Sequence, residues 1–486
     1  MRSALTVHTS ILVAVLFVFE SIHAQQKPLY TYQQLSNVAY AKQKDSLKKT
    51  WVCPTVFSDK DAQKKYKDVW DSRVAFITDA IENKNYIYEK ELYDYVGGII
   101  QDIAAANPSL IPHQPLLLID RSSSVNAYSY GGNIIAVNVG LILFSNCREE
   151  LALAIAHELS HNILNHADRA IKERIEWLTS DEYKKSLNAV LDSKYERFSQ
   201  LKKIIENYSF TRSKHNRYHE SDADSLAIIL LNNSKIGFDA KFFLHLDSSD
   251  LRYKTPLQKP VEQYFTTYGL PFEDWWTQRK GKGLSTHNYN FQDTTGVEDS
   301  IKTHPDCIVR YEKTASRSST HMQYTAIPAS LKETADRIMI WNQFDNMSLS
   351  ACLYNVLLAK DRGVTDEWYD FMLHNVIAGL YYADLNLMRF TAIGITQKEY
   401  ISKNFYELQN MLEQMPKDKL QAYYKDLQST SFWGKMPADA KGLKLLMSRL
   451  TTGQKDDKEH EVAAKDFMNS YNESMYCEFA DHFRKK

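Results

Sequence analysis

The stretch Asn146 to His161, NCREELALAIAHELSH, decides the architecture of this chain of 486 residues. Its apolar run from Leu151 to Ala156 leads into His157-Glu158-Leu159-Ser160-His161. Two histidines four residues apart lie on one face of a helix, where both rings can bind one metal ion. Asn146 is a suitable N-cap, with Glu149 three residues later. The stretch therefore predicts a buried helix that carries a metal site.

Glu158 lies about 100° around that helix from His157. From there its carboxylate can reach a metal-bound water without binding the metal, so we expect Glu158 to be the general base. Burying two imidazoles and a carboxylate without partners would cost roughly 2 kcal/mol or more for each group, and a metal with its water would supply the partners. The alternative interpretation makes His157 and His161 hydrogen-bonded core histidines and Glu158 a surface charge.

A zinc site of this kind needs a third protein ligand and leaves its fourth position to water. Glu220 is the candidate, because it lies at the start of a second apolar stretch, Tyr218 to Leu231, which predicts another buried helix. Asp224 follows one turn later on the same face. Its carboxylate can accept the other N–H of a ligating histidine and fix the orientation of that ring.

Three further histidines are rival ligands. His166 lies about 140° from His161 if the helix continues through it, and the sequence between them lacks the glycine of the His-x-x-Gly-x-x-His pattern. His215 and His219 precede Glu220 in the sequence. The alternative interpretation treats each of them as an ordinary polar residue at a helix start.

Four motifs follow one another between Leu92 and about Thr314. They are Asn126-Ala127-Tyr128 with a strand from Gly131 to Gly140-Leu141, the His157 to His161 motif, Glu220-Ser221-Asp222-Ala223-Asp224, and His304-Pro305 with Arg310 six positions after the histidine. In this order they resemble the gluzincin zinc metallopeptidase family of HtpX, BepA and the type 1 CAAX prenyl protease. The several spanning helices of the membrane-embedded branch are absent from the sequence, so we expect a soluble, exported member.

The resemblance assigns three ligands to one Zn²⁺ per chain: His157, His161 and Glu220. It implies Glu158 as the catalytic base, His304 as the stabiliser of the oxyanion, Arg310 as a supporting residue and Asp224 as the carboxylate behind a ligand. The expected function is that of a zinc-dependent metalloendopeptidase acting on exported or misfolded proteins. The alternative is a non-catalytic, chaperone-like or scaffold protein on a peptidase fold, which the retention of the base and the ligands argues against.

Two β-type runs precede the histidine motif, Pro115 to Ile119 and Asn133 to Val139, and the second is bounded by glycines. Clefts of such peptidases bind extended peptide by strand addition, so we expect the second run to be an edge strand. The predicted substrate-binding residues are Asn133, Ile134, Ile135, Ala136 and Val137. The alternative is that this run forms an interior strand.

The whole pattern predicts an α+β, mostly helical protein, with a zincin-type peptidase domain that holds a small β-sheet and an all-α C-terminal region. We expect a signal peptide at 1–24, an N-terminal helical segment at 25–90, the peptidase domain at 91–325 and the helical domain at 326–486. Polar, turn-rich sequence from Pro271 to Thr303 predicts a long surface loop. The C-terminal helical patterns lack a clean 34-residue period, so a tetratricopeptide array is one option among others.

The N-terminal sequence and the composition indicate the compartment of the protein and the kind of partner it binds. Arg2 and the apolar run from Ile11 to Phe19, followed by Ala24, are typical of a cleaved secretory signal, with an uncleaved anchor as the alternative. We therefore expect a periplasmic or secreted protein with no transmembrane anchor after signal cleavage. A net charge of -1 favours a protein or peptide substrate over nucleic acid. The five scattered cysteines give little support to a disulfide framework, and the C-terminal helices are a candidate surface for a protein partner.

Overall fold

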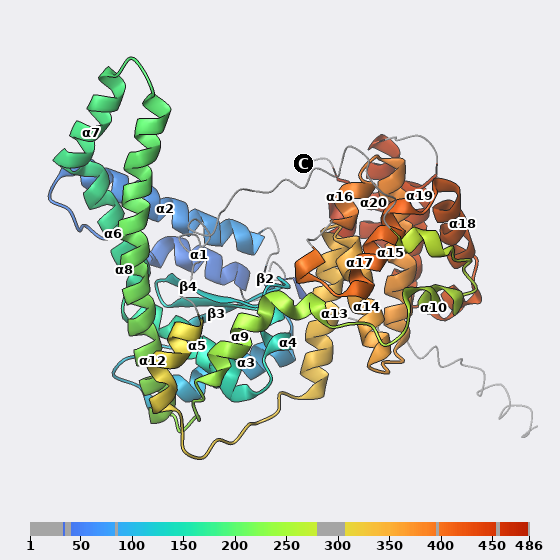
Figure 1. The fold of residues 1–486 in the computed structure, drawn as a ribbon, viewed down its shortest axis with the longest axis horizontal. Helices are drawn as coiled ribbons and strands as arrows, with labels where there is room; N and C mark the ends of the chain where they lie inside the picture. The colour runs from blue at the N-terminus through green and yellow to red at the C-terminus, as the bar shows by residue number, and fades with distance from the viewer. Residues whose placement is uncertain are drawn as a thin grey trace, which may run out of the picture.

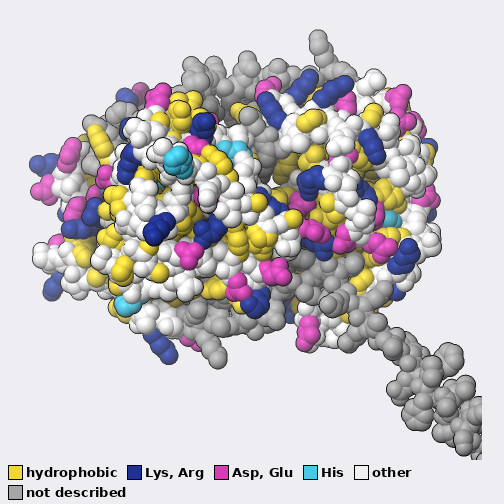
Figure 2. Space-filling model, turned by 90° about the horizontal axis from the view of Figure 1, so that it is seen from below, with side chains coloured by type: hydrophobic (Ala, Val, Ile, Leu, Met, Phe, Trp, Pro, Cys, Tyr) yellow, Lys and Arg dark blue, Asp and Glu magenta, His cyan; other side chains and the backbone are white. Residues whose placement is uncertain are grey.

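The computed structural model describes residues 33–34, 40–82, 86–278, 307–394, 398–452 and 457–484. The predicted fold class is confirmed, because most of these residues are helical and one small sheet lies in the N-terminal half of the chain. In Figure 1 the sheet and the helices around it lie on the left, and the C-terminal helices form the group on the right. Basic and acidic side chains intermix over the face drawn in Figure 2, in keeping with the near-zero net charge.

The first elements are β1 (Gln33–Gln34), α1 (Tyr40–Thr50), α2 (Lys60–Glu82), β2 (Tyr86–Tyr88) and α3 (Lys90–Ala106). The helices α1 and α2 agree with the helical segment predicted at 25–90. The short strand β2 lies within that segment and does not follow from the sequence, because three residues are too few to establish an alternating pattern. The other strands are β3 (Leu116–Asp120), β4 (Ala127–Gly131) and β5 (Ile134–Asn138).

The five-stranded sheet has the order β1-β2-β3-β5-β4. β5 pairs with β3 in the parallel sense and with β4 in the antiparallel sense, and all five of its residues are buried. The prediction that the run beginning at Asn133 is a substrate-pairing edge is therefore wrong. Both sides of β5, with Ile134, Ile135, Ala136 and Val137, are already paired within the sheet. The strand at this edge of the sheet is β4.

The tip of the β4–β5 hairpin is covered by the N-terminal helices. Gly132 has a φ of 60°, and a Cβ added there would lie 2.4 Å from the ring of Trp51, so only glycine fits this position. Next to it, Arg73 of α2 donates a hydrogen bond of 2.7 Å to Asp168. Asn133, with a φ of 63°, completes the left-handed turn into β5.

α4 (Val139–Phe144) follows β5 directly, and α5 (Arg148–Ile163) carries the histidine motif. The prediction of a buried helix is confirmed, since nearly all residues of α5 before His161 are buried. Asn162, in the last turn, donates its side-chain amide to the carbonyl oxygen of Ile134 at 3.3 Å. The helix is therefore fixed against the interior strand β5.

The predicted N-cap of α5 is wrong. The helix begins at Arg148, and Cys147 is its N-cap residue. Backbone groups at the start of the helix find hydrogen-bond partners in a distant segment. Cys147 forms a β-bridge with Ala326, and the N–H of Arg148 donates to the carbonyl oxygen of Thr325 at 2.8 Å. Sequence reasoning could not find these partners, because they lie almost 180 positions away along the chain.

The next helices are α6 (His166–Thr179), α7 (Asp181–Asp192), α8 (Arg197–Asn233) and α9 (Lys241–Asp247), and α12 (Cys307–Thr314) follows much later. The second buried helix expected from Tyr218 to Leu231 is the C-terminal part of the long, continuous α8. That part of α8 packs along α5. The two predicted site helices are therefore neighbours.

The C-terminal region is all-helical, as predicted, in the residues that the structure describes. Its elements are η5 (Ala315–Arg317), α13 (Ala329–Asp345), α14 (Leu349–Asp361), α15 (Glu367–Leu385), α16 (Arg389–Ile393), η6 (Lys398–Tyr400), α17 (Lys403–Gln414), α18 (Lys417–Gln428), η7 (Ser431–Lys435), α19 (Ala438–Leu450), α20 (Asp457–Ser470) and α21 (Cys477–Asp481). No described helix is both long enough and apolar enough to cross a membrane. All five cysteines lie in described segments, and none of them forms a disulfide.

Three earlier elements also join the C-terminal helices: η2 (Ser248–Lys254), α10 (Val261–Thr266) and η3 (Asp274–Thr277), each of which contacts α17. The prediction of a surface loop is wrong at its start, because Trp276 is fully buried and its carbonyl accepts from Gln414 at 3.1 Å. The rest of that predicted loop, from residue 279, lies outside the described residues, as does the signal segment at 1–24. The domain limits stay a prediction.

Candidate metal centre

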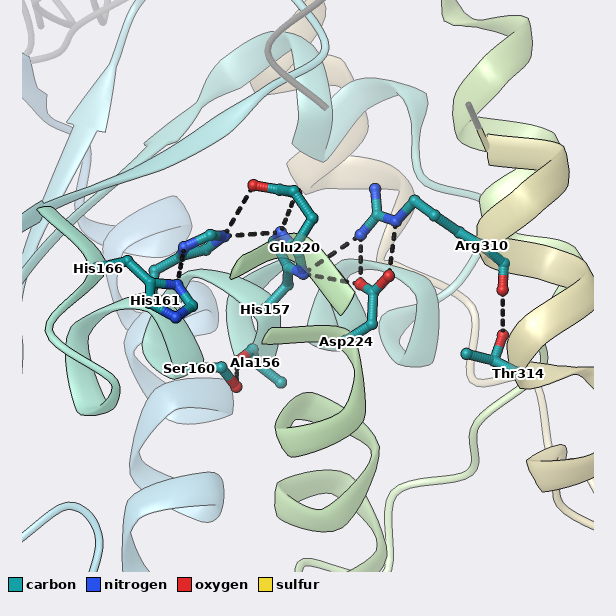
Figure 3. A network of polar contacts seen from close by, with 9 residues as sticks. All are labelled: Ala156, His157, Ser160, His161, His166, Glu220, Asp224, Arg310 and Thr314. Atoms are coloured by element: carbon teal, nitrogen blue, oxygen red, sulfur yellow. Dashed lines mark hydrogen bonds and ion pairs between the residues drawn. The ribbon is translucent and has the colours of Figure 1, made fainter. Parts of the chain in front are cut away.

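The structure brings three predicted ligands together at one point between α5 and α8 (Figure 3). The Nε2 atoms of His157 and His161 lie 3.1 Å apart. Glu220 presents one carboxylate oxygen to each ring, at 3.2 Å from His157 Nε2 and 3.4 Å from His161 Nε2. These atoms form the only such group of three possible metal ligands among the described residues.

The separations fit a tetrahedral zinc ion. Zinc bonds of about 2.0–2.2 Å in a tetrahedron place neighbouring ligand atoms about 3.3–3.6 Å apart. The observed separations of 3.1 to 3.4 Å agree with that spacing to within a few tenths of an ångström. Two imidazole nitrogens and one carboxylate are also a set of donors that zinc accepts with a fourth position left for water. The three residues therefore fit the metal that the motif predicts.

Asp224 lies behind His157, on the side away from Glu220. Its Oδ1 accepts from His157 Nδ1 at 2.9 Å, which directs the other ring nitrogen towards Glu220. Burial opposes ionisation of Asp224, but the hydrogen bond from His157 and the positive charge of Arg310 outweigh it and lower the pKa of this carboxyl to about 2. The carboxylate is therefore charged at all physiological pH values.

Arg310 completes this arrangement from α12. Its Nε donates to Asp224 Oδ2 at 2.9 Å and its Nη2 donates to Asp224 Oδ1 at 2.5 Å, a bidentate pair. The guanidinium also stacks on Phe243, 4.3 Å from the ring centroid. Burial disfavours the charge of Arg310, but the carboxylate of Asp224 outweighs it and raises the pKa of the guanidinium. A residue 153 positions from His157 thus helps to fix its ring.

His166 contacts the other ligand, a role that the sequence argument missed. Its Nδ1 lies 2.8 Å from Nδ1 of His161, and the residue is 5% exposed. The calculation of 140° assumed a continuous helix, but α5 ends at Ile163 and Asn165 takes a left-handed conformation with a φ of 54°. The turn brings His166 back onto His161. Burial, and then the neighbouring His161 and His219, lower the pKa of His166 to about 3, so it is neutral.

Glu158, the predicted base, is buried at 6% exposure and lines a cavity together with His157. Among the described residues, none is hydrogen-bonded to its carboxylate. A base that is near the metal ligands and not engaged elsewhere can bind a water molecule and take its proton. The placement matches the predicted role, which stays a prediction.

The remaining predicted site residues lie either apart from the ligand group or outside the described residues. His219 stacks on His166 with ring centroids 4.3 Å apart and is not in the group of ligands. The side chain of His215 and the whole of His304 lie outside the described residues. β5 contributes no free edge, for the reason given above. The spacing between His161 and His166 is visible in the sequence. It brings the two rings together only because α5 ends between them, at Ile163.

The chain is similar to known peptidases over part of its length. Residues 94–318 match the family model of peptidase family M48. The chain is also similar to a protein of Vibrio cholerae serotype O1 (strain ATCC 39315 / El Tor Inaba N16961) named "Putative beta-barrel assembly-enhancing protease", with 26% identity over 178 residues. That similarity covers 35% of this chain and 36% of the relative, so most of both proteins lies outside it.

Proposed function

We propose that this chain, which carries a peptidase M48 domain at residues 94–318, is a zinc-dependent metalloendopeptidase. The family of the domain supports the class of reaction, the hydrolysis of peptide bonds. The convergence of His157, His161 and Glu220 supports the metal, and it is the single observation that carries the proposal. A chaperone-like protein without activity would not need a base and three ligands in this arrangement.

The residues divide the reaction among them. When bound, Zn²⁺ would lower the pKa of a water molecule towards about 7 and polarise the scissile carbonyl. Glu158 takes a proton from the attacking water and later delivers it to the leaving nitrogen. Asp224 and Arg310 hold the ring of His157 so that its Nε2 keeps its direction. His304, assigned by the resemblance, would donate a hydrogen bond to the oxyanion.

The main chain of the substrate would lie along β4. None of the described strands pairs with the outer side of β4, so one row of its backbone groups is available for an added strand. Its first residue, Ala127, lines the same cavity as Glu158. A peptide paired with β4 would therefore pass the catalytic base, which β5 cannot achieve from inside the sheet.

The substrates that we propose are exported or misfolded proteins, met in the periplasm or outside the cell. The apolar run from Ile11 to Phe19 supports export. The relative named for β-barrel assembly also supports it, although the similarity covers only about a third of either protein. The C-terminal helices are the proposed surface for a protein partner.

The first test is the Glu158→Gln variant on an unfolded protein substrate. Its amide cannot accept a proton, so kcat should fall by at least roughly 10²- to 10⁴-fold, while zinc content stays at the wild-type value because Glu158 is not a ligand. Turnover comparable to the wild-type enzyme would place the base elsewhere. Loss of zinc in this variant would mean that Glu158 belongs to the ligand set.

A further inference from the structure

A second cavity lies between α8 and α12, apart from the cavity that Glu158 lines. It has a volume of about 170 Å³. Arg310 is the one described residue that lines both cavities, and its guanidinium is held by the bidentate pair with Asp224. The second cavity therefore borders the metal centre without belonging to it.

Cations dominate the wall of this cavity. Arg310, Lys313 and Arg317 are three and four residues apart, so they lie on one face of the chain as it passes from α12 into η5. Asp224 is the one carboxylate among the described residues that line the cavity. Three cations and one carboxylate leave a net charge of +2, and a cleft lined mainly by one sign of charge concentrates ions of the opposite sign.

These cations keep donors that the described part of the chain does not use. Arg310 donates to Asp224 from Nε and Nη2, and no dashed line reaches its third guanidinium nitrogen in Figure 3. Arg317 donates from Nη2 to the carbonyl oxygen of Ser225 at 3.1 Å, which leaves its Nε and Nη1 for another acceptor. Lys313 is exposed and forms no ion pair with a described residue. A ligand with several acceptor oxygens can therefore bind here without breaking an existing contact.

The rest of the wall is mostly polar. Ser221 and Ser225 lie one turn apart on α8, and each hydroxyl can donate a hydrogen bond to a ligand. Thr314 is buried, and its hydroxyl donates to the carbonyl oxygen of Arg310 at 2.8 Å. Val309 is the one apolar side chain that the described residues place in this wall. An apolar occupant would remove water from the cations without replacing its hydrogen bonds, which is costly.

The volume and the charge together match a small oxyanion. Liquid water takes roughly 30 Å³ per molecule, so the cavity corresponds to about five or six water molecules, enough for a tetrahedral oxyanion with some water. A phosphate group carries about -1.5 to -2 charges at pH 7, close in magnitude to the charge of the wall. The guanidinium of Arg317 can donate two parallel hydrogen bonds to its oxygens, and the ammonium of Lys313 binds it as a compact charge.

We propose that the cavity between α8 and α12 is a binding site for a phosphate group. Lys313 and Arg317 supply the charge that holds the group, and the hydroxyls of Ser221 and Ser225 supply further donors. The site is separate from the proposed catalytic centre, and the proposal does not depend on peptide hydrolysis.

The test is calorimetric titration of the zinc-loaded full chain with inorganic phosphate at constant ionic strength, because salt screens exposed charges. Lys313→Gln should weaken phosphate binding by roughly 10-fold and Arg317→Gln by roughly 10- to 100-fold, the usual effect of losing a charged hydrogen-bond partner. Ser225→Leu should prevent binding, because it fills the cavity without changing a charge. Lys241→Gln is the control, since Lys241 is an exposed lysine of α9 outside both cavities and its loss should leave the affinity unchanged.

Three results would overturn the proposal. The wild-type chain binds no phosphate, or Lys313→Gln and Arg317→Gln bind it as tightly as the wild type, which would place the anion elsewhere, for example on the zinc. Equal losses in Lys313→Gln and Lys241→Gln would show attraction to the general surface charge. Glycerol 3-phosphate distinguishes the sources of the group: an affinity equal to that of phosphate supports an esterified ligand, and an affinity about 10-fold lower or less supports the free anion.

Discussion

Two clusters of buried polar side chains lie in different parts of this architecture, and they are built differently. At the metal centre, His157, His161 and Glu220 point their ligand atoms at one another (Figure 3). In the second cluster, Arg121 after β3 pairs with two buried carboxylates of the C-terminal helices, Asp345 at 3.0 Å and Glu478 at 2.8 Å.

The second cluster has donors directed at each of its two carboxylates. Trp341 donates to Glu478 at 2.9 Å, and His482 lies 3.0 Å from Asp345, whose hydrogen bond raises the pKa of that histidine. At the metal centre, His157 Nδ1 already donates to Asp224, so in the neutral ring its Nε2 is an acceptor that faces the acceptor oxygens of Glu220. The difference teaches how to distinguish the two kinds of site. Matched donors and acceptors indicate a structural contact, and converging acceptors indicate a cation.

The largest effect that sharpens this comparison is on stability. Arg121→Met removes the donor shared by two buried carboxylates, so the free energy of unfolding should fall by about 3–5 kcal/mol, measured by chemical denaturation. Zinc content should not change, since Arg121 is not a ligand. An unchanged unfolding free energy would show that the cluster contributes nothing to stability, and loss of zinc would remove the distinction between the two clusters.

A smaller effect is expected at His166. It fixes the ring of His161 through the contact between their Nδ1 atoms, and loss of such a partner typically weakens metal binding by about 10- to 100-fold. His166→Ala should show that loss in a zinc competition titration with a chelator. His219→Ala is the matched control, because it removes a ring stacked on His166 but leaves the contact with His161 in place. Equal losses in both variants would contradict a specific role for His166.

The smallest effect is on the pH dependence of zinc binding. Burial and the charge of Arg310 lower the pKa of His157 in the metal-free protein, but the hydrogen bonds to Asp224 and Glu220 outweigh them and raise it to about 9. The proton on His157 therefore stabilises the metal-free protein fully below about pH 6.5, and that contribution is lost as the pH rises through the raised value. Zinc must displace this proton, so its affinity should rise by up to about 10-fold per pH unit from 7 to 9 and then level off. A zinc affinity that does not change between pH 7 and 9 in calorimetric titrations would contradict this expectation.

The sequence predicted what depends on local periodicity. The spacing of His157, His161, Glu220 and Asp224 follows from one helical period on each of two helices, and the apolar runs placed both helices in the core. The features that could not be predicted from the sequence depend on contacts between residues that are distant in it. The interior position of β5 follows from strand order, which periodicity does not encode. The contact of His166 depends on the left-handed turn at Asn165 that ends a helix.

The most direct test of the central claim is the zinc content of the purified full chain, measured by elemental analysis after purification without chelators. We expect about one zinc per chain in the wild-type and Glu158→Gln proteins and little or none in His161→Ala, because three ligands are needed to hold the ion. Wild-type protein without zinc, or His161→Ala protein with the wild-type zinc content, would contradict the claim that these converging acceptors form a metal site.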